Sequence, residues 1–157
     1  MMTLLWQDAL DDLSAAKLHF REAVAIFENA GFMPGVAPDY VNSMAFQHAM
    51  QSGYTSFEGA LKRIFAMLDE PLPVGGDWHR DLVMRAIKPI PDERPAIIGE
   101  ALASPVLDLM RFRHVAMHSY DRFDVEKAAV AVGHARSFLG SIDADIARFR
   151  AVIDPPT

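Results

Sequence analysis

The chain contains no cysteine, so it can form neither a disulfide nor a thiolate metal site. No apolar run approaches the roughly 18 residues that a membrane-spanning helix needs. There is no glycine-rich phosphate loop, no internal repeat and no low-complexity tract. The N-terminus carries an early acidic residue and no basic leader, so it does not resemble a signal peptide. We therefore expect a cytoplasmic protein with no membrane partner.

An excess of basic residues is also lacking. The chain has 15 Lys and Arg against 21 Asp and Glu, which gives a net charge of -6. Broad coating of nucleic acid is therefore excluded, because that binding depends on a basic surface. One local exception is the stretch that holds Arg111, Arg113 and Arg122, whose twelve residues include a single acid, Asp121. This stretch is either a chance cluster or a local phosphate-binding surface.

The hydrophobic residues that are present follow the period of an α-helix. They make up 51% of the 157 residues, which suits one folded domain over residues 1–157. No segment shows the alternation of a β-strand, so we predict an all-α antiparallel bundle of about five helices. The five predicted helices cover residues 4–30, 39–68, 78–87, 96–118 and 124–153. In the first and last of these, apolar residues alternate at spacings of three and four, which predicts packing against a near-parallel helix.

Glycine, proline and aspartate set the expected ends and bends of these helices. Gly31 is expected to stop the first helix, and Asp77 to cap the third. Pro95 falls near the first turn of the fourth helix, where proline is tolerated, and Pro105 is expected to bend it. Gly53 is a candidate kink in the second helix.

The most informative stretch lies at the end of the fourth predicted helix. Within eight residues it holds Arg113, His114, His118 and Tyr120, although the whole chain has only six histidines. Arginine binds phosphate as a permanently charged fork, and histidine exchanges protons near neutral pH. A site that cleaves phosphodiester bonds needs little more than these two groups.

Helical geometry constrains how these side chains can meet. Arg113 falls near the centre of the apolar face, where a charge is costly unless it is paired or faces a cleft. His118 lies about 140° around the helix from Arg113, and it shares a second face with His114 and Arg111. Both groups can therefore reach one phosphate only if the helix breaks near His118 or a second copy of the chain contributes. We expect a two-fold symmetric homodimer.

The pattern Arg-x4-His-x-Tyr, here Arg113, His118 and Tyr120, resembles the signature of HEPN nucleotide-binding and ribonuclease domains. More specifically, most of the chain looks like the HepT-like toxin family. The segments that carry this likeness are 54–64, 77–82 and 111–120. The resemblance implies a HEPN-type bundle, a homodimer with its site at the subunit interface, and metal-independent RNA cleavage. It also implies a partner antitoxin, an MNT-type nucleotidyltransferase that transfers AMP to Tyr120.

The chemistry of such a site follows from the residue types. RNA supplies its own nucleophile, the 2'-hydroxyl, so the protein needs a proton acceptor, a proton donor and a phosphate ligand. We predict His118 as the base or acid, Arg113 as the stabiliser of phosphate charge, and His114 as a supporting or alternate proton carrier. Arg111 and Glu58 are predicted supporting residues. The expected product is a 2',3'-cyclic phosphate.

Several alternatives remain open at this level. Glu58 is either a counter-charge that orients Arg113 or an exposed carboxylate paired with Lys62. Trp78, followed by His79, is favoured as a core anchor over a second wall of the cleft.

No metal or other cofactor is expected. His114 and His118 have a metal-ligand spacing, but the glutamate of a zincin is replaced by Val115. The rival functions are a catalytically silent helical module that binds nucleotide or protein, and a plain dimeric scaffold.

Overall fold

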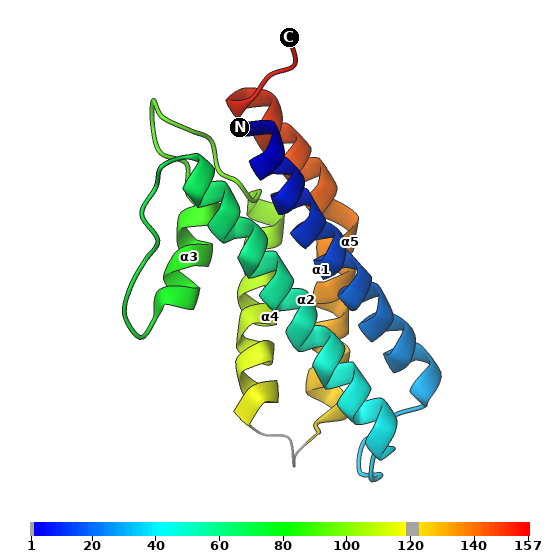
Figure 1. Cartoon of the computed structure of the whole chain (residues 1–157). Helices are drawn as coiled ribbons and strands as arrows, with labels where there is room; N and C mark the ends of the chain where they lie inside the picture. The colour runs from blue at the N-terminus through cyan, green and yellow to red at the C-terminus, as the bar shows by residue number, and fades with distance from the viewer. Residues whose placement is uncertain (1, 119–122) are drawn as a thin grey trace.

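The computed structural model describes residues 2–118 and 123–157, and within them it contains five α-helices and no strand. The helices are α1 (Met2–Ala30), α2 (Tyr40–Met67), α3 (Trp78–Ile87), α4 (Glu100–His118) and α5 (Val125–Ile153). Four long helices run up and down side by side, and the short α3 lies to one side of α2 and α4 (Figure 1). The start of α1 and the end of α5 lie at the same end of the molecule. The all-α bundle of HEPN type is therefore confirmed.

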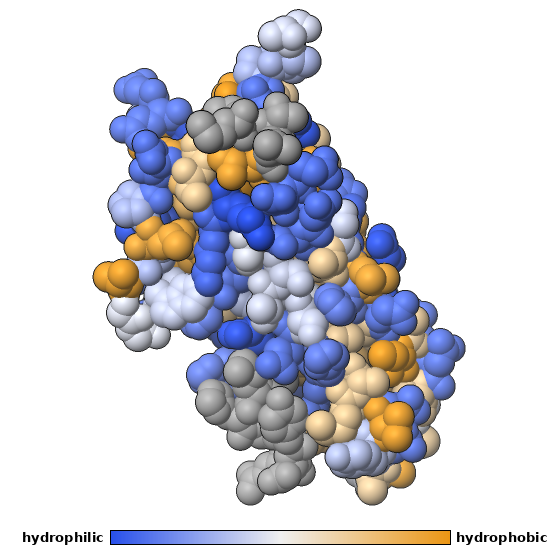
Figure 2. Space-filling view, in the orientation of Figure 1, coloured by the Kyte–Doolittle hydropathy of each residue, from blue (hydrophilic) through white to orange (hydrophobic). Residues whose placement is uncertain are grey.

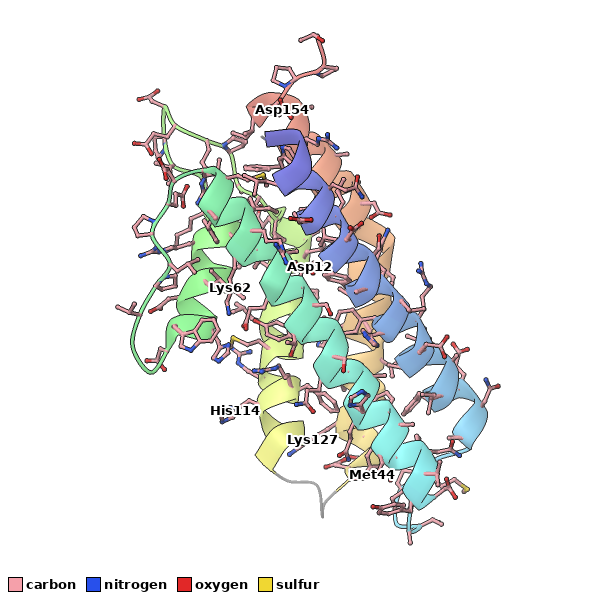
Figure 3. The ribbon with its side chains drawn as sticks, viewed as in Figure 1. Asp12, Met44, Lys62, His114, Lys127 and Asp154 are labelled. Carbon is pink, nitrogen blue, oxygen red and sulfur yellow. The ribbon has the colours of Figure 1, made fainter. Side chains whose placement is uncertain are left out.

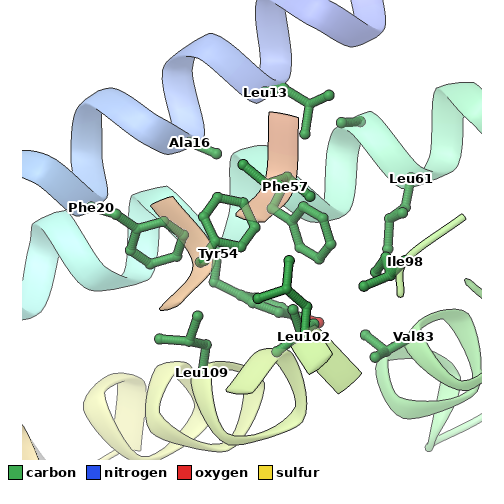
Figure 4. Packing of buried hydrophobic residues seen from close by; sticks show 14 of the residues in the cluster. Leu13, Ala16, Phe20, Tyr54, Phe57, Leu61, Val83, Ile98, Leu102 and Leu109 are labelled. Carbon is green, nitrogen blue, oxygen red and sulfur yellow. The ribbon is translucent and has the colours of Figure 1, made fainter. Parts of the chain in front are cut away.

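The predicted apolar seams form the core. In α1, small residues alternate with large ones, so neighbouring helices, α2 above all, approach closely while the large side chains interlock. The buried seam residues are Trp6, Ala9, Leu13, Ala16, Phe20, Ala23, Ala128, Val132, Ala135, Ile142, Ile146 and Phe149. In the centre, the ring of Phe138 lies 5.0 Å from Phe20 and 5.1 Å from Phe57. Figure 4 shows Phe20 of α1 beside Tyr54 and Phe57 of α2 in this layer.

The glycines predicted to interrupt helices have different roles. Gly31 adopts a φ of +66°, which is the left-handed conformation typical of a helix stop, and α1 ends there as predicted. In contrast, α2 continues through Gly53. A Cβ atom at position 53 would lie 2.9 Å from the ring of Phe20, so this glycine lets α1 and α2 pack closely.

The predicted start of the fourth helix was wrong. Residues 96–99 are not helical, and α4 begins at Glu100. The backbone N–H groups of Ile97 and Ile98 donate instead to the carbonyl oxygen of Ala86, at 2.9 and 3.1 Å. Gly99 N–H donates to the carboxylate of Asp145 at 2.8 Å. In a helix that began at residue 96, these N–H groups would lie in the first turn and have no partner within the helix.

The loops around α3 are fixed by a buried cation. Arg94 is 7% exposed and binds the carboxylate of Glu70. It also donates to the carbonyl oxygens of Arg85, Lys88 and Pro95. A single guanidinium thus joins the segments on both sides of α3 to the end of α2.

The cap of α3 differs from the prediction. Asp77 does occupy the N-cap position, but its side chain makes no capping hydrogen bond.

Candidate functional site

Arg113 reaches from α4 to α2. Its Nε donates to the hydroxyl Oγ1 of Thr55 at 3.0 Å, and its guanidinium carbon lies 5.9 Å from the centroid of the Tyr54 ring. The side chain is half-buried, which agrees with its place on the apolar face of α4. Within residues 2–118 and 123–157, its two terminal nitrogens have neither a hydrogen-bond nor an ion-pair partner. They present a positive fork that can bind an anion.

Tyr54, beneath this arginine, is 1% exposed. Burial raises the pKa of its hydroxyl above the usual value, and the charge and proximity of the Glu58 carboxylate raise it further, while Arg113 lowers it. The hydroxyl makes no hydrogen bond of normal geometry with the described residues, although Glu58 is close enough to influence it. Tyr54 therefore stays neutral, with both a carboxylate and a guanidinium near it.

Glu58 is paired with a histidine from α3. The carboxylate is buried, with 3% of the residue exposed, and its Oε2 lies 2.6 Å from Nδ1 of His79. A carboxylate only accepts hydrogen bonds, so Nδ1 carries a proton, and in the neutral form of the ring the lone pair lies on Nε2. The alternative of an exposed Glu58 paired with Lys62 is therefore wrong. In the described part of the chain, no ion pair joins Glu58 to Arg113 either.

Trp78 completes this side of the site. Its ring is half-buried at the edge of the core and stacks on His79, with centroids 3.6 Å apart at an interplanar angle of 29°. The Nζ of Lys62 lies 4.3 Å from the centroid of the Trp78 ring. Figure 3 shows Lys62 extending from α2 on the side of α3. Trp78 therefore contacts the core, as the favoured interpretation has it, and also stacks on the site histidine, while its place as a second wall of the cleft stays a prediction.

The site therefore has two parts. In one, Lys62 contacts Trp78, which stacks on His79, and His79 in turn bonds to Glu58. In the other, Thr55 holds Arg113. On the face of the molecule in Figure 2, hydrophilic side chains occupy much of the middle, whereas hydrophobic ones gather at the left edge and lower right.

The sequence predictions gave no role to Thr55 and left His79 without a partner. The spacing of three between Thr55 and Glu58, which places both on one face of α2, was the available signal.

Two other predicted residues point elsewhere. Arg111 is exposed, and its Nη1 bonds to Asp108 at 2.6 Å on the side of α4 that faces α5. Asp108 also binds His134 of α5 at 3.1 Å. The structure therefore does not bring Arg111 to Arg113. His114 is exposed, and Figure 3 shows its side chain directed away from the bundle.

His118 is the last residue of α4, and its side chain, like the whole of Tyr120, lies outside the described residues. The backbone of α4 is continuous from Arg113 to His118, so no helix break separates the two. An angle of about 140° between them follows from regular helix geometry.

Two features of the described residues bear on cofactors and membranes. In residues 2–118 and 123–157, no group of three or more histidine and acidic side chains could hold a metal ion. None of the helices described above is both long and apolar enough to cross a bilayer.

An all-helical bundle of HEPN type, with an arginine of α4 held against α2, defines the class of protein. Comparison with known sequences then gives the family: the family model described as "HepT-like protein" matches residues 45–153. The chain belongs to the HepT-like family, and this membership indicates a toxin of HEPN type. The matched region includes α2 from residue 45 onward, the helices α3 to α5, and all the site residues described above. No curated protein and no solved structure matches the chain significantly.

Proposed function

We propose that this protein is an endoribonuclease toxin that cleaves RNA without a metal ion. The observation that carries this proposal is the state of Arg113: Thr55 holds its Nε, and its terminal nitrogens have no partner in the described residues. An anchored guanidinium with two free donor groups matches the geometry of a phosphodiester. The family match supports the same general function.

The proposed reaction is a transesterification within the RNA. The 2'-oxygen loses its proton to a base and forms a bond to phosphorus, and the bond from phosphorus to the 5'-oxygen then breaks. The leaving oxygen takes a proton from an acid, so the products are a 2',3'-cyclic phosphate and a 5'-hydroxyl. Arg113 stabilises the negative charge that gathers on the non-bridging oxygens. His118 transfers a proton, and His114 serves as a supporting or alternate carrier.

The proposal includes an assembly and a partner. Since one straight helix holds Arg113 and His118 apart, a two-fold homodimer lets one subunit complete the site of the other. The partner antitoxin is an MNT-type nucleotidyltransferase that adds AMP to Tyr120. The added phosphate would repel RNA from a cleft that binds phosphate, and its bulk would block access. We place this reaction in the cytoplasm, where mRNA and tRNA are available.

The direct test incubates purified protein with defined RNAs in the presence of EDTA and maps the cleaved ends. We expect 2',3'-cyclic phosphate ends from the wild type and no cleavage where the 2'-hydroxyl is replaced by hydrogen. Arg113→Ala and His118→Ala should each abolish turnover. RNA binding that survives in the wild type without any cleavage would favour the silent binding module instead.

Expression in a bacterial host tests the toxin assignment. We expect the wild type to arrest growth and His118→Ala not to. Growth arrest by both proteins would contradict a nuclease toxin.

A further inference from the structure

Because α4 is continuous, the same chain's His118 does not supply a proton acceptor on the side that Arg113 faces. Arg113 faces α2, while helix geometry turns His118 about 140° away from it. A second imidazole lies on the side that Arg113 does face. We infer that His79, held by Glu58, is the general base that removes the 2'-hydroxyl proton from RNA bound to Arg113 of the same chain. This inference rests on the proposed function and extends it.

The position of His79 follows from α2, which anchors both groups. Thr55 binds Arg113 and Glu58 binds His79. Thr55 and Glu58 are three residues apart, so they are neighbours on one helix face, with Cβ atoms about 5–6 Å apart. The pKa of the buried Tyr54 hydroxyl is shifted by the charges of both Glu58 and Arg113, so both charges lie near this hydroxyl. The α2 residues that hold the guanidinium and the imidazole are thus about one helical turn apart.

Two contacts fix the orientation of the His79 ring. Glu58 Oε2 accepts from Nδ1 at 2.6 Å, which fixes the tautomer of the neutral ring as the one with its lone pair on Nε2. The ring of Trp78 stacks on the imidazole and holds its plane. The His79 side chain is 32% exposed, so solvent and substrate can reach it, whereas the Glu58 side chain is 4% exposed. A base held by a buried carboxylate is the arrangement by which a triad histidine is aligned.

The alternative is that His79 only satisfies a buried carboxylate. An unpaired buried charge is costly, so Glu58 requires some partner. Lys62 lies four residues along α2, which is the usual spacing for an ion pair, yet its Nζ lies over Trp78. The position next to Glu58 is instead taken by a side chain that still has an unused nitrogen after making the hydrogen bond. This choice of partner favours proton transfer over simple charge neutralisation.

In the proposed transesterification, His79 accepts one proton and His118 gives one up. His79 Nε2 takes the proton of the 2'-hydroxyl as the 2'-oxygen bonds to phosphorus. Glu58 stabilises the imidazolium that forms, through the bond at Nδ1. The bond to the 5'-oxygen breaks, and that oxygen takes a proton from His118, which the second subunit of the proposed homodimer supplies as the acid. His79 then loses its extra proton to water, and His118 regains one.

The test compares His79→Ala, Glu58→Gln and a control variant, His48→Ala, on one RNA that the wild type cleaves. His48 suits the control because it is an exposed α2 histidine with a long 3.4 Å contact to Ser52 and lies outside the site. For His79→Ala we expect kcat to fall about 10²–10⁴-fold with little change in KM. Added imidazole should restore part of the lost rate by taking the vacated place. Glu58→Gln keeps an oxygen that accepts from Nδ1, so it should fold normally but turn over slowly.

The results distinguish a general base at His79 from a histidine that only neutralises Glu58. Loss of kcat with imidazole rescue, at unchanged melting temperature, supports the inference. Wild-type turnover in His79→Ala overturns it and leaves the proposed nuclease intact, as does a lower melting temperature with a rate that imidazole does not restore. If the wild type cleaves none of the RNAs, the proposed function fails and the role of His79 fails with it.

Discussion

Arg113 Nε and Thr55 Oγ1 lie 3.0 Å apart, and this hydrogen bond joins α4 to α2 at the site. Removing the acceptor in Thr55→Val, which keeps the shape of the side chain, should release the guanidinium from its position. A hydrogen bond to a charged group contributes about 1.5–3 kcal/mol, so we expect kcat/KM for RNA cleavage to fall by about tenfold or more. Steady-state cleavage of a short RNA measures this change.

Thr55→Ser is the matched control, because it keeps the hydroxyl and should retain most of the activity. Equal cleavage by wild type and Thr55→Val would show that Arg113 does not need this anchor. A large loss in Thr55→Ser with a normal Thr55→Val would contradict the positioning role altogether.

The close approach of α1 and α2 at Gly53 gives a prediction about stability. In Gly53→Ala the new methyl group would meet the Phe20 ring at 2.9 Å, so the packed helices must shift. Such overpacking costs about 1–3 kcal/mol, and the free energy of unfolding should fall by that amount. Urea denaturation monitored by circular dichroism provides the measurement.

Gly133→Ala should have the opposite effect on stability. Gly133 lies in the interior of α5, and nothing is within 4 Å of a Cβ atom built there. Alanine favours the helix over glycine by about 0.8–1 kcal/mol, so this variant should be more stable than the wild type. If both glycine variants change stability in the same direction, packing at Phe20 is not the cause.

The buried pair of Arg94 and Glu70 should be essential for stability. Arg94→Ala leaves Glu70 without its cation and three carbonyl oxygens without a donor. Breaking a buried pair in this way costs about 3–5 kcal/mol, which urea denaturation would detect. Arg136→Ala removes an exposed ion pair with Glu28 and should cost less than about 1 kcal/mol. Similar losses in the two variants would contradict the importance of burial.

The sequence was sufficient to predict those features whose signal is local. Seams such as the one from Trp6 to Ala23 repeat at helical spacing, so α1 and α5 could be predicted almost to their ends. The start of α4 could not be, because residues 96–99 look helical locally. Their backbone partners, Ala86 and the carboxylate of Asp145, lie in α3 and α5, so no local pattern indicates them.

In the site, too, the features with a local signal could be predicted and the long-range contacts could not. The place of Arg113 on an apolar face was visible in the sequence, and this residue does lie half-buried at a helix junction. The partner of Glu58 was not visible, because His79 is 21 residues away and Lys62 offered a local alternative at the correct helical spacing. Only the packing of α3 against α2 shows that the imidazole, rather than the ammonium, reaches the carboxylate.

The buried hydroxyl of Tyr54 predicts how stability depends on pH. Because burial raises the pKa of this group in the folded state, folding favours its neutral form. Below about pH 10 the hydroxyl is neutral in both states, and its contribution to stability is fully present. Above that pH the unfolded chain loses the proton and the folded one keeps it. The free energy of unfolding should then fall by up to about 1.4 kcal/mol for each pH unit.

Tyr54→Phe isolates this effect, since it removes the ionisable group and keeps the ring. At pH 7 we expect its stability to lie within about 1 kcal/mol of the wild type, because the hydroxyl has no well-formed hydrogen bond with the described residues. At pH 11 the wild type should have lost more stability than the variant, when both are measured by urea denaturation. Parallel pH profiles for the two proteins would mean that the Tyr54 hydroxyl ionises as easily in the folded chain as in the unfolded one.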